Sequence, residues 1–499
     1  MTSLTIPAVL PPLPPGADQR SPAIHSVEKI GGTSMSAVDA VFTNILLAPA
    51  NRHHPYQRVF VVSAYGGVTN SLLEHKKTGE PGVYACFAAN DGSQDWEAAL
   101  AAALERMLNI NSELFAAGEQ RLAADRFISE RVGEVRHCLT DLQRLCGFGH
   151  FDMGEQLGRV REMLACLGEA HSAFNTVLLL NLRGVNGRFV DLTGWRGDQQ
   201  LSLEARIVDA FKTIDLATEL PIVTGYAHCR NGLMHSYDRG YSEITFSALA
   251  AVTGAREAII HKEYHLSSAD PLLVGPELVV PIGRTNYDVA DQLSLLGMEA
   301  IHPQAARRLR QAGIPLRIKN TFEPDHPGTL IDADYRSQRP CVEIIAGRSR
   351  LNAVTIFDHE MVGQRGYEQR LMALIERSSL VLVARDHNAN SLTLYLAGPL
   401  ATVQRLSTEL QEQLPTATIS GARVAAVAAI GSDLRRTGLL AQAVEALAAA
   451  RIGVLAVQQS CRQVEIRFMV ADADYQAAVR VLHRALVECH NHGEAICAA

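Results

Sequence analysis

The sequence predicts an α/β protein with a mostly parallel central sheet, followed by a tail that contains two ferredoxin-like units. Short β-branched runs alternate with helix-like segments before about residue 335, a pattern typical of parallel sheets covered by helices on both faces. A glycine pair follows the first apolar run and indicates a strand, a turn and then a helix. In the tail, strand and helix signals recur twice in a βαββα-like order.

The first expected strand covers residues 24–27, and the helix after the glycine turn covers residues 37–47. Residues 58–64 form a β-branched run that ends in small residues, which indicates a buried strand. Further strands are expected at 185–190, 220–223 and 258–261, and helices over most of 96–182, at 242–253 and at 288–296.

Residues 336–340 are expected to be a linker, and two similar units follow at 341–415 and 420–490. The expected tail strands are 353–357, 379–384, 391–397, 423–430, 454–458 and 465–470; the expected helices are 366–378, 401–414, 437–450 and a last one that runs to 487. Residues 1–23 are rich in proline and are expected to be a disordered leader.

Composition excludes several functional classes. The net charge is −7 and no sustained basic block occurs, so a nucleic-acid partner is not expected. The 9 cysteines are dispersed without a CxxC pair, so neither a zinc site nor a redox dithiol is predicted. Dispersed thiols fit a reducing cytosol, so the expected location is cytoplasmic. No uninterrupted apolar run predicts a membrane span.

The glycine turn Lys29-Ile30-Gly31-Gly32-Thr33-Ser34 is the strongest local signal for chemistry. Adjacent glycines let the backbone approach a polyanion, and the N-terminus of the next helix directs free N–H groups toward it. A lysine beside such a turn can neutralise the charge that develops during phosphoryl transfer. The stretch matches neither GxxxxGK[ST] nor GxGxxG, and by itself a Gly-Gly turn at a strand end more often reflects simple connection geometry.

Several later motifs, in one order, make the chain resemble the aspartate kinases of the amino-acid kinase fold, with two ACT domains as the tail. They are Val61-Val62-Ser63-Ala64, Gly66-Gly67-Val68-Thr69-Asn70, Gly154-Glu155, Thr224-Gly225-Tyr226, Arg239-Gly240, Ser268-Ala269-Asp270-Pro271, Ile301-His302-Pro303 and Ile318-Lys319-Asn320-Thr321-Phe322. The resemblance begins near residue 26 and runs to the C-terminus. It implies a catalytic domain at 24–335.

The resemblance also implies a reaction, namely ATP-dependent phosphorylation of the side-chain carboxylate of L-aspartate to 4-phospho-L-aspartate. This product opens synthesis of the aspartate-family amino acids or of ectoine. A carboxylate is already nucleophilic, so the protein must mainly align two anions and neutralise charge. Mg²⁺ would be held through the ATP phosphates, without a metal site of the protein's own. The tail implies a possible lysine or threonine effector and at least a homodimer.

Roles follow by analogy with the family. Lys29 and Glu243 are assigned to catalysis. The predicted ATP contacts are Lys29, Gly31, Gly32, Lys262, Glu263, Ser268 and Asp270. The predicted aspartate contacts are Ser63, Ala64 and Thr69, with Glu155 for the ammonium group and Arg239 for the α-carboxylate.

Each assignment has a structural alternative. Glu155 can be a solvated charge near a helix start, and Arg239 a surface cation. Ser63 can simply end a strand, and Asp270-Pro271 is also a common turn pair.

The chain departs from the usual family pattern after Arg239. It has Gly240-Tyr241-Ser242-Glu243 where Gly-Gly-Ser-Asp is usual, so a bulky ring replaces bare backbone. Glu299 stands where some members carry a lysine. Lys29-Ile30, in place of the commoner Lys-Phe, and Lys262-Glu263-Tyr264 resemble the aspartate kinases associated with ectoine synthesis. Two alternatives stay open: an ACT-domain amino-acid sensor with a degenerate kinase site, and a kinase for another carboxylate on the same fold.

Overall fold

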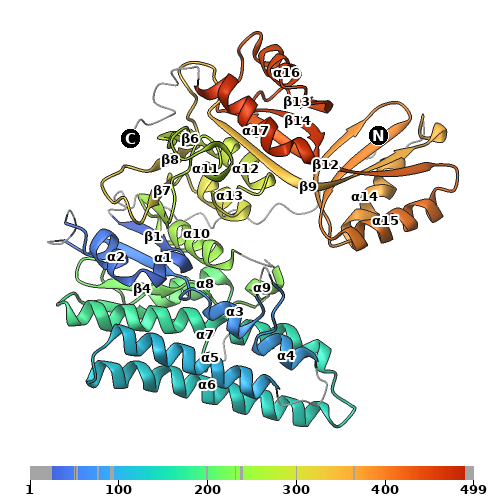
Figure 1. The fold of residues 1–499 in the computed structure, drawn as a ribbon. Coiled ribbons are helices and arrows are strands. Elements are labelled where there is room, and N and C mark those ends of the chain that lie inside the picture. The colour runs from blue at the N-terminus through green and yellow to red at the C-terminus, as the bar shows by residue number, and fades with distance from the viewer. Residues whose placement is uncertain are drawn as a thin grey trace, which may run out of the picture.

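The computed structural model describes residues 25–49, 51, 54–75, 78–89, 95–197, 200–230, 232–236, 240–298, 300–362 and 366–488. The predicted leader at 1–23 lies outside these ranges. Figure 1 shows two parts, a sheet-and-helix body and a tail whose sheet stands apart from it. The predicted α/β architecture with a two-unit tail is therefore confirmed.

The body contains an eight-stranded sheet in the order β3-β4-β2-β1-β5-β7-β8-β6. All described pairings are parallel except that of β7 with β8, as the sequence led us to expect. The strands are β1 (Ser26–Ile30), β2 (Arg58–Val62), β3 (Gly187–Val190), β4 (Leu220–Thr224), β5 (Glu257–Lys262), β6 (Arg284–Asn286), β7 (Leu316–Asn320) and β8 (Thr329–Asp332). β1 and β2 are buried along their whole length.

Three long helices form a layer below the sheet in Figure 1: α5 (Asp95–Leu114), α6 (Glu119–Cys146) and α7 (Met153–Leu182). By length and composition α7 could cross a membrane, but 83% of its most apolar window is buried inside the fold. Its apolar character is thus that of a core helix, which packs against β3 and β4. A second helix, α10 (Tyr241–Thr253), packs against β1 and β2.

Shorter helices connect the strands of the body. They are α1 (Gly32–Ser36), α2 (Val38–Val41), a π-helical turn at Phe42–Leu46, α3 (Val68–Leu72), α4 (Val83–Ala89), α8 (Leu203–Phe211), α9 (Leu233–Ser236), α11 (Pro271–Val274), α12 (Tyr287–Leu295) and α13 (Pro303–Gln311). The single helix expected at 37–47 is therefore a series of short turns.

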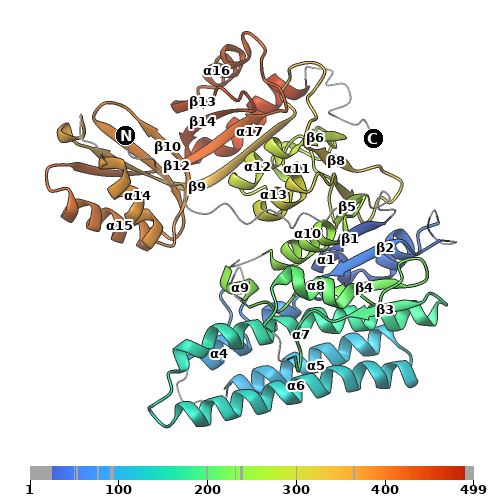
Figure 2. The same ribbon diagram turned by 180° about the vertical axis from the view of Figure 1, so that it is seen from behind.

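The tail has one antiparallel sheet in the order β10-β11-β9-β12-β14-β13. Its elements are β9 (Ile344–Phe357), α14 (Tyr367–Arg377), β10 (Val381–His387), β11 (Ser391–Ala397), α15 (Leu400–Gln413), β12 (Thr418–Ile430), α16 (Leu439–Ala449), β13 (Val454–Gln459), β14 (Glu465–Ala471) and α17 (Tyr475–His483). Figure 2 shows β9 and β12 extending from one unit of the tail into the other.

The two long central strands change the boundary that the sequence suggested. The second half of β9 pairs with β11, whereas its first half pairs with the part of β12 that borders β14. Val342 and Ile345 accordingly lie in the core of the second unit. A first unit at 341–415 and a second at 420–490 therefore do not describe the packing, because each unit takes half of both strands.

Candidate active site

Lys29 is the cation at the centre of the candidate site. It lies on β1, is only 8% exposed, and its Nζ is 3.3 Å from Oε1 of Glu243 on α10. The other oxygen of Glu243 accepts a hydrogen bond from the backbone N–H of His302 at 2.5 Å. Burial raises the pKa of Glu243, but the charges of Lys29 and Lys262 outweigh it and hold this pKa below its usual value. The two predicted catalytic residues thus lie together as an ion pair.

Two glycine turns, one after β1 and one after β2, meet beside Lys29. A Cβ on Gly32 would lie 2.9 Å from the carbonyl oxygen of Ala64, so only glycine lets the turns approach this closely. Gly31 precedes α1, and Lys29 lies two residues before it on the buried strand. The result is bare backbone next to a fixed cation, which is the arrangement that a phosphate chain requires. The residues present therefore fit a nucleotide phosphate.

A chain of hydrogen bonds runs from Ser63, in the glycine turn after β2, to Glu169 on α7. The hydroxyls of Ser63 and Ser242 are 3.5 Å apart, and Ser242 donates to Oε1 of Glu169 at 2.9 Å. Ser172 fixes the turn by donating to the carbonyl oxygen of Ser63 at 2.8 Å. Glu169 is 2% exposed. A buried carboxylate beside two hydroxyls, close to Lys29, can bind an ammonium group.

The prediction for Glu155 is wrong, because the structure places Glu155 elsewhere on the same helix. It is exposed near the start of α7, and 14 residues separate it from Glu169. At 1.5 Å per residue this is about 21 Å along the helix axis. Glu155 instead lines a cavity of about 670 Å³ with Glu162, Arg159 and Tyr226.

The signal that identifies Glu169 was in the sequence. Gly168-Glu169 is a second Gly-Glu pair on the same helix, after Gly154-Glu155. A Cβ on Gly168 would lie 2.8 Å from Cβ of Ala64 and 3.0 Å from a methyl of Val68. Glycine is therefore required at position 168, where α7 packs against the glycine turn after β2. At Gly154 a Cβ would meet the Asp152 carboxylate instead.

The predicted nucleotide residues divide into two groups. Lys262 is the last residue of β5 and Glu263 follows it. The charge of Lys262 acts on Glu243, so this end of β5 lies near the ion pair of Lys29 and Glu243. Ser268 does not: it is 0% exposed and its hydroxyl hydrogen-bonds Nε2 of His483 on α17 at 2.9 Å. Its predicted ATP contact is incompatible with this burial.

Asp270 also has a local structural role that the prediction missed. Its carboxylate accepts the N–H of Leu272 at 2.9 Å and caps α11, which packs against α17. Ser268 and Asp270 therefore join the body to the tail.

The remaining predicted residues are placed as follows. Ala64 is buried in the turn after β2, and Thr69 lies on α3 with a side-chain hydrogen bond to Tyr241. Arg239 and Glu299 lie outside the described residues. Among the described residues, no three His, Cys, Asp or Glu side chains gather as a metal site.

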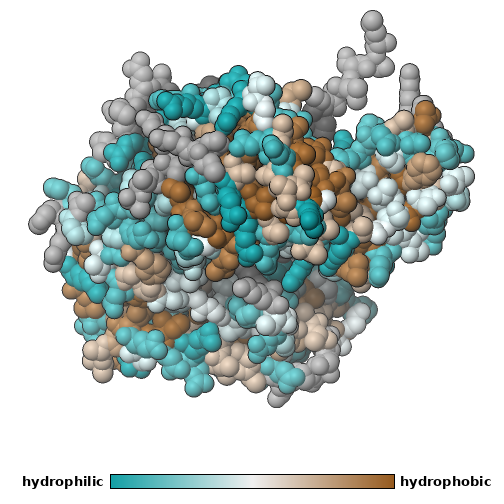
Figure 3. Space-filling model, turned by 45° about the horizontal axis from the view of Figure 1, so that its top comes forward, coloured by the Kyte–Doolittle hydropathy of each residue, from teal (hydrophilic) through white to brown (hydrophobic). Residues whose placement is uncertain are grey.

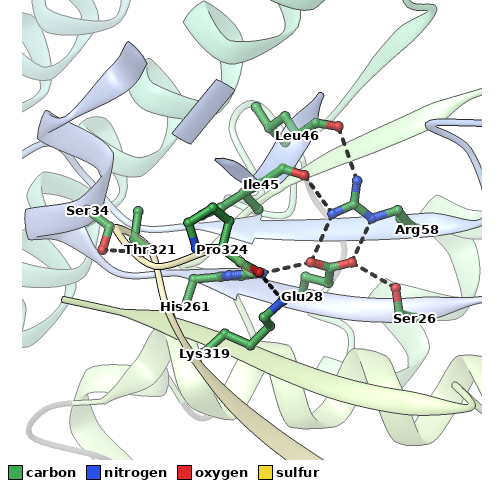
Figure 4. Close-up of polar contacts among 10 residues, drawn as sticks. All are labelled: Ser26, Glu28, Ser34, Ile45, Leu46, Arg58, His261, Lys319, Thr321 and Pro324. Atoms are coloured by element: carbon green, nitrogen blue, oxygen red, sulfur yellow. Dashed lines mark hydrogen bonds and ion pairs between the residues drawn. The ribbon is translucent and has the colours of Figure 1, made fainter. Parts of the chain in front are cut away.

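A buried charged network supports the strand that carries Lys29. Glu28 is 3% exposed and accepts hydrogen bonds from Arg58 at 2.7 and 3.1 Å. His261 lies 2.7 Å from the same carboxylate, and Ser26 donates to it at 2.9 Å (Figure 4). Arg58 also donates to two carbonyl oxygens at the end of the π-helical turn. The network therefore ties β1, β2 and β5 together directly beneath the site.

Comparison with known families gives the class of protein. The sequence profile of the amino acid kinase family matches residues 26–320, and an ACT domain profile matches residues 427–486. Together with the site around Lys29, these matches show that the chain belongs to the amino acid kinase family.

Individual relatives show which member of the amino acid kinase family this chain resembles. The chain is 54% identical over 476 residues to aspartate kinase Ask_Ect of Stutzerimonas stutzeri, a match covering 95% of this chain and 100% of the relative. It is 26% identical to chloroplastic aspartokinase 1 of Arabidopsis thaliana, covering 93% of this chain and 80% of that one. Within its family the chain is therefore an aspartate kinase.

Solved structures agree in fold. Escherichia coli aspartokinase III in complex with aspartate and ADP matches with a TM-score of 0.69 at 19% identity, over 93% of this chain and 99% of that one. Clostridium acetobutylicum aspartate kinase matches with a TM-score of 0.69 at 18% identity, over 92% and 100%. Body and tail are thus arranged as in these enzymes.

Proposed function

We propose that the protein transfers the γ-phosphoryl group of ATP to the side-chain carboxylate of L-aspartate. The observation that carries this proposal is the pairing of Lys29 with Glu243 at the meeting point of two glycine turns. In the transfer a carboxylate oxygen attacks phosphorus in line, and ADP leaves. Lys29 would neutralise charge on both reacting anions, and Glu243 would hold its ammonium group in place.

The two substrates would occupy opposite sides of Lys29. Gly31 and Gly32 would cradle the phosphates with backbone N–H groups, and Lys262 and Glu263 would border the nucleotide. Mg²⁺, when bound through the ATP phosphates, would neutralise their charge. Ser63, Ala64 and Thr69 would line the aspartate side, where Glu169 would bind the ammonium group and Arg239 the α-carboxylate.

Substitution of Glu169 tests the aspartate site. Glu169→Gln should raise the KM for aspartate about 10- to 100-fold, since a hydrogen bond to a charged group contributes about 1.5–3 kcal/mol. The KM for ATP should change little. Glu155→Gln is the matched control, because it removes the same charge from the exposed start of α7. Initial rates of hydroxamate formation from acyl phosphate and hydroxylamine provide the measurement. If both substitutions changed the KM for aspartate equally, the assignment of Glu169 to the ammonium group would be refuted.

For the pathway, we propose ectoine synthesis rather than general aspartate-family synthesis. The support is the 54% identity to a relative named Ask_Ect, together with the Lys29-Ile30 and Lys262-Glu263-Tyr264 segments. Genes for ectoine enzymes next to this gene would support the assignment, and their absence from the genome would contradict it.

We also propose that the tail binds a lysine or threonine effector and forms at least a homodimer. Apolar side chains are exposed on the outer strands β10 and β13, namely Val381, Leu455 and Val457. Figure 3 shows apolar patches among hydrophilic residues on the face it presents. Gln458 on β13 already donates to the Arg385 carbonyl oxygen on β10, so it is these exposed apolar side chains, and not free strand edges, that can pack against a second chain. Sedimentation should give at least twice the 54.2 kDa chain mass, and calorimetry should detect the effector.

A further inference from the structure

The first turn of α10 contacts three different parts of the site with three consecutive residues. Tyr241 hydrogen-bonds with Thr69, Ser242 with Glu169, and Glu243 with Lys29. Ser242 and Glu243 already have roles, as the support of the ammonium-binding carboxylate and of the catalytic lysine. Tyr241 has no assigned role, although its ring stands where the resemblance leads us to expect bare backbone.

Tyr241 contacts two residues near the proposed aspartate site, Thr69 and Tyr226. Its hydroxyl meets Thr69, and its ring packs edge-on against Tyr226 with centroids 5.9 Å apart and planes at 72°. The carboxylate of Glu169 is close enough to act on the Tyr241 hydroxyl, whose pKa is raised well above its usual value mainly by burial. The phenol is thus a neutral, fixed group beside the proposed ammonium site.

Behind Tyr226 lies the cavity of about 670 Å³. Tyr226 lines it, and its hydroxyl is bound to Glu162 on the same wall. Cys166 also lines this cavity, and it lies one helical turn before Glu169 on α7. The cavity and the acceptor side therefore follow the same face of α7. Tyr226 lines the cavity, whereas Tyr241 packs against Tyr226 and does not line it.

We propose that Tyr241 sets the length of the acceptor substrate. Its ring closes the acceptor side against the cavity, so a four-carbon amino dicarboxylate fits and the homologue with one more methylene does not. The proposal rests on the assignment of aspartate to the Ser63, Thr69 and Glu169 side. A steric limit of this kind is worth about 10- to 200-fold in kcat/KM per methylene.

Removal of the ring should admit L-glutamate to the same reaction. A side-chain carboxylate oxygen of glutamate would form the new bond to the γ-phosphorus. The bond from that phosphorus to the bridging oxygen would break, and its electron pair would leave on ADP. The additional methylene would occupy the volume that the ring vacates toward Tyr226, and no further reactant is required.

The experiment compares Tyr241→Ala with Tyr241→Phe. For each enzyme, kcat/KM is measured for L-aspartate and for L-glutamate with MgATP, and the acyl phosphate is trapped with hydroxylamine. Tyr241→Ala should raise the glutamate-to-aspartate ratio of kcat/KM at least about tenfold. Tyr241→Phe keeps the ring and loses only the bond to Thr69, so it should keep the wild-type ratio while the KM for aspartate rises severalfold.

Two results would overturn the proposal: an unchanged ratio in a folded Tyr241→Ala enzyme, or a shifted ratio in Tyr241→Phe. If the alanine enzyme does not fold, Tyr241→Leu shortens the side chain with a smaller loss of packing and should raise the ratio in the same direction. Failure here is distinguishable from failure of the proposed site. An unchanged ratio alongside a raised aspartate KM in Glu169→Gln would reject only the role of Tyr241.

Discussion

Replacement of Lys29 with methionine should lower kcat about a thousandfold while the protein remains folded. Methionine keeps most of the length and apolar volume of the side chain but removes the charge at the meeting point of the glycine turns. Removal of one group that stabilises transition-state charge costs about 10²–10³ in rate, and cationic groups in phosphoryl transfer are worth about 10³–10⁵. Steady-state hydroxamate formation at saturating aspartate and MgATP measures the loss.

Two further variants show whether charge at this position is the cause. Lys212→Met removes a surface lysine that pairs with Asp209, and it should leave kcat unchanged. Lys29→Arg keeps the charge but changes its shape, so its activity should lie between those of the wild type and Lys29→Met. A kcat within tenfold of wild type in Lys29→Met would exclude the catalytic role.

Replacement of Glu28 with glutamine should have the largest effect on stability. Glu28 is enclosed by Arg58, His261 and Ser26, and loss of its charge leaves the Arg58 guanidinium buried without a counter-ion. Breaking a buried ion pair from one side costs about 3–5 kcal/mol of the free energy of unfolding. Denaturant unfolding gives this difference. Glu204→Gln removes one partner of the partly exposed pair with Arg308 and should cost less than about 1 kcal/mol.

The same carboxylate predicts the acid dependence of stability. Burial alone would raise the pKa of Glu28, but the charge of Arg58 and the hydrogen bond with His261 lower it well below its usual value. Between the unfolded pKa of about 4.3 and the lower folded pKa, the unfolded chain binds more protons. Stability from Glu28 is therefore complete above about pH 5 and is lost as the pH falls through this window. In Glu28→Gln this acid-dependent loss should be smaller; an identical pH profile would contradict the assignment.

Much of the body could be predicted from sequence because its signals are local. The Lys29 turn, the Ser63 turn and the strands that carry them are continuous stretches in which apolar runs end at glycines. Parallel strands buried on both faces are rich in apolar residues, so the existence of strands such as β2 and β4 follows from composition. Glu243 could be placed because it lies three residues after Gly240 at the start of a helix.

The failures concern residues whose partners are distant in sequence. Two Gly-Glu pairs on α7 look alike locally, and only packing against Ala64 and Val68 distinguishes Gly168-Glu169. Ser268 resembles a nucleotide residue within its own segment, but its partner, His483, is 215 positions away. The first half of β9 was not expected as a strand because its pairing with the second unit depends on β12.

The sharing of β9 and β12 makes the tail one cooperative element. A chain that ends after residue 415 keeps β9 but lacks β12, so the first unit is left without one of its two long strands. Both cores should therefore be lost together. Chemical denaturation of the tail should accordingly be a single transition. A molecule that stabilises one unit of the tail would therefore also restrain the other, because β9 and β12 run through both units. β9 starts directly after Glu343, whose carboxylate accepts a hydrogen bond from Thr285 on β6 of the body.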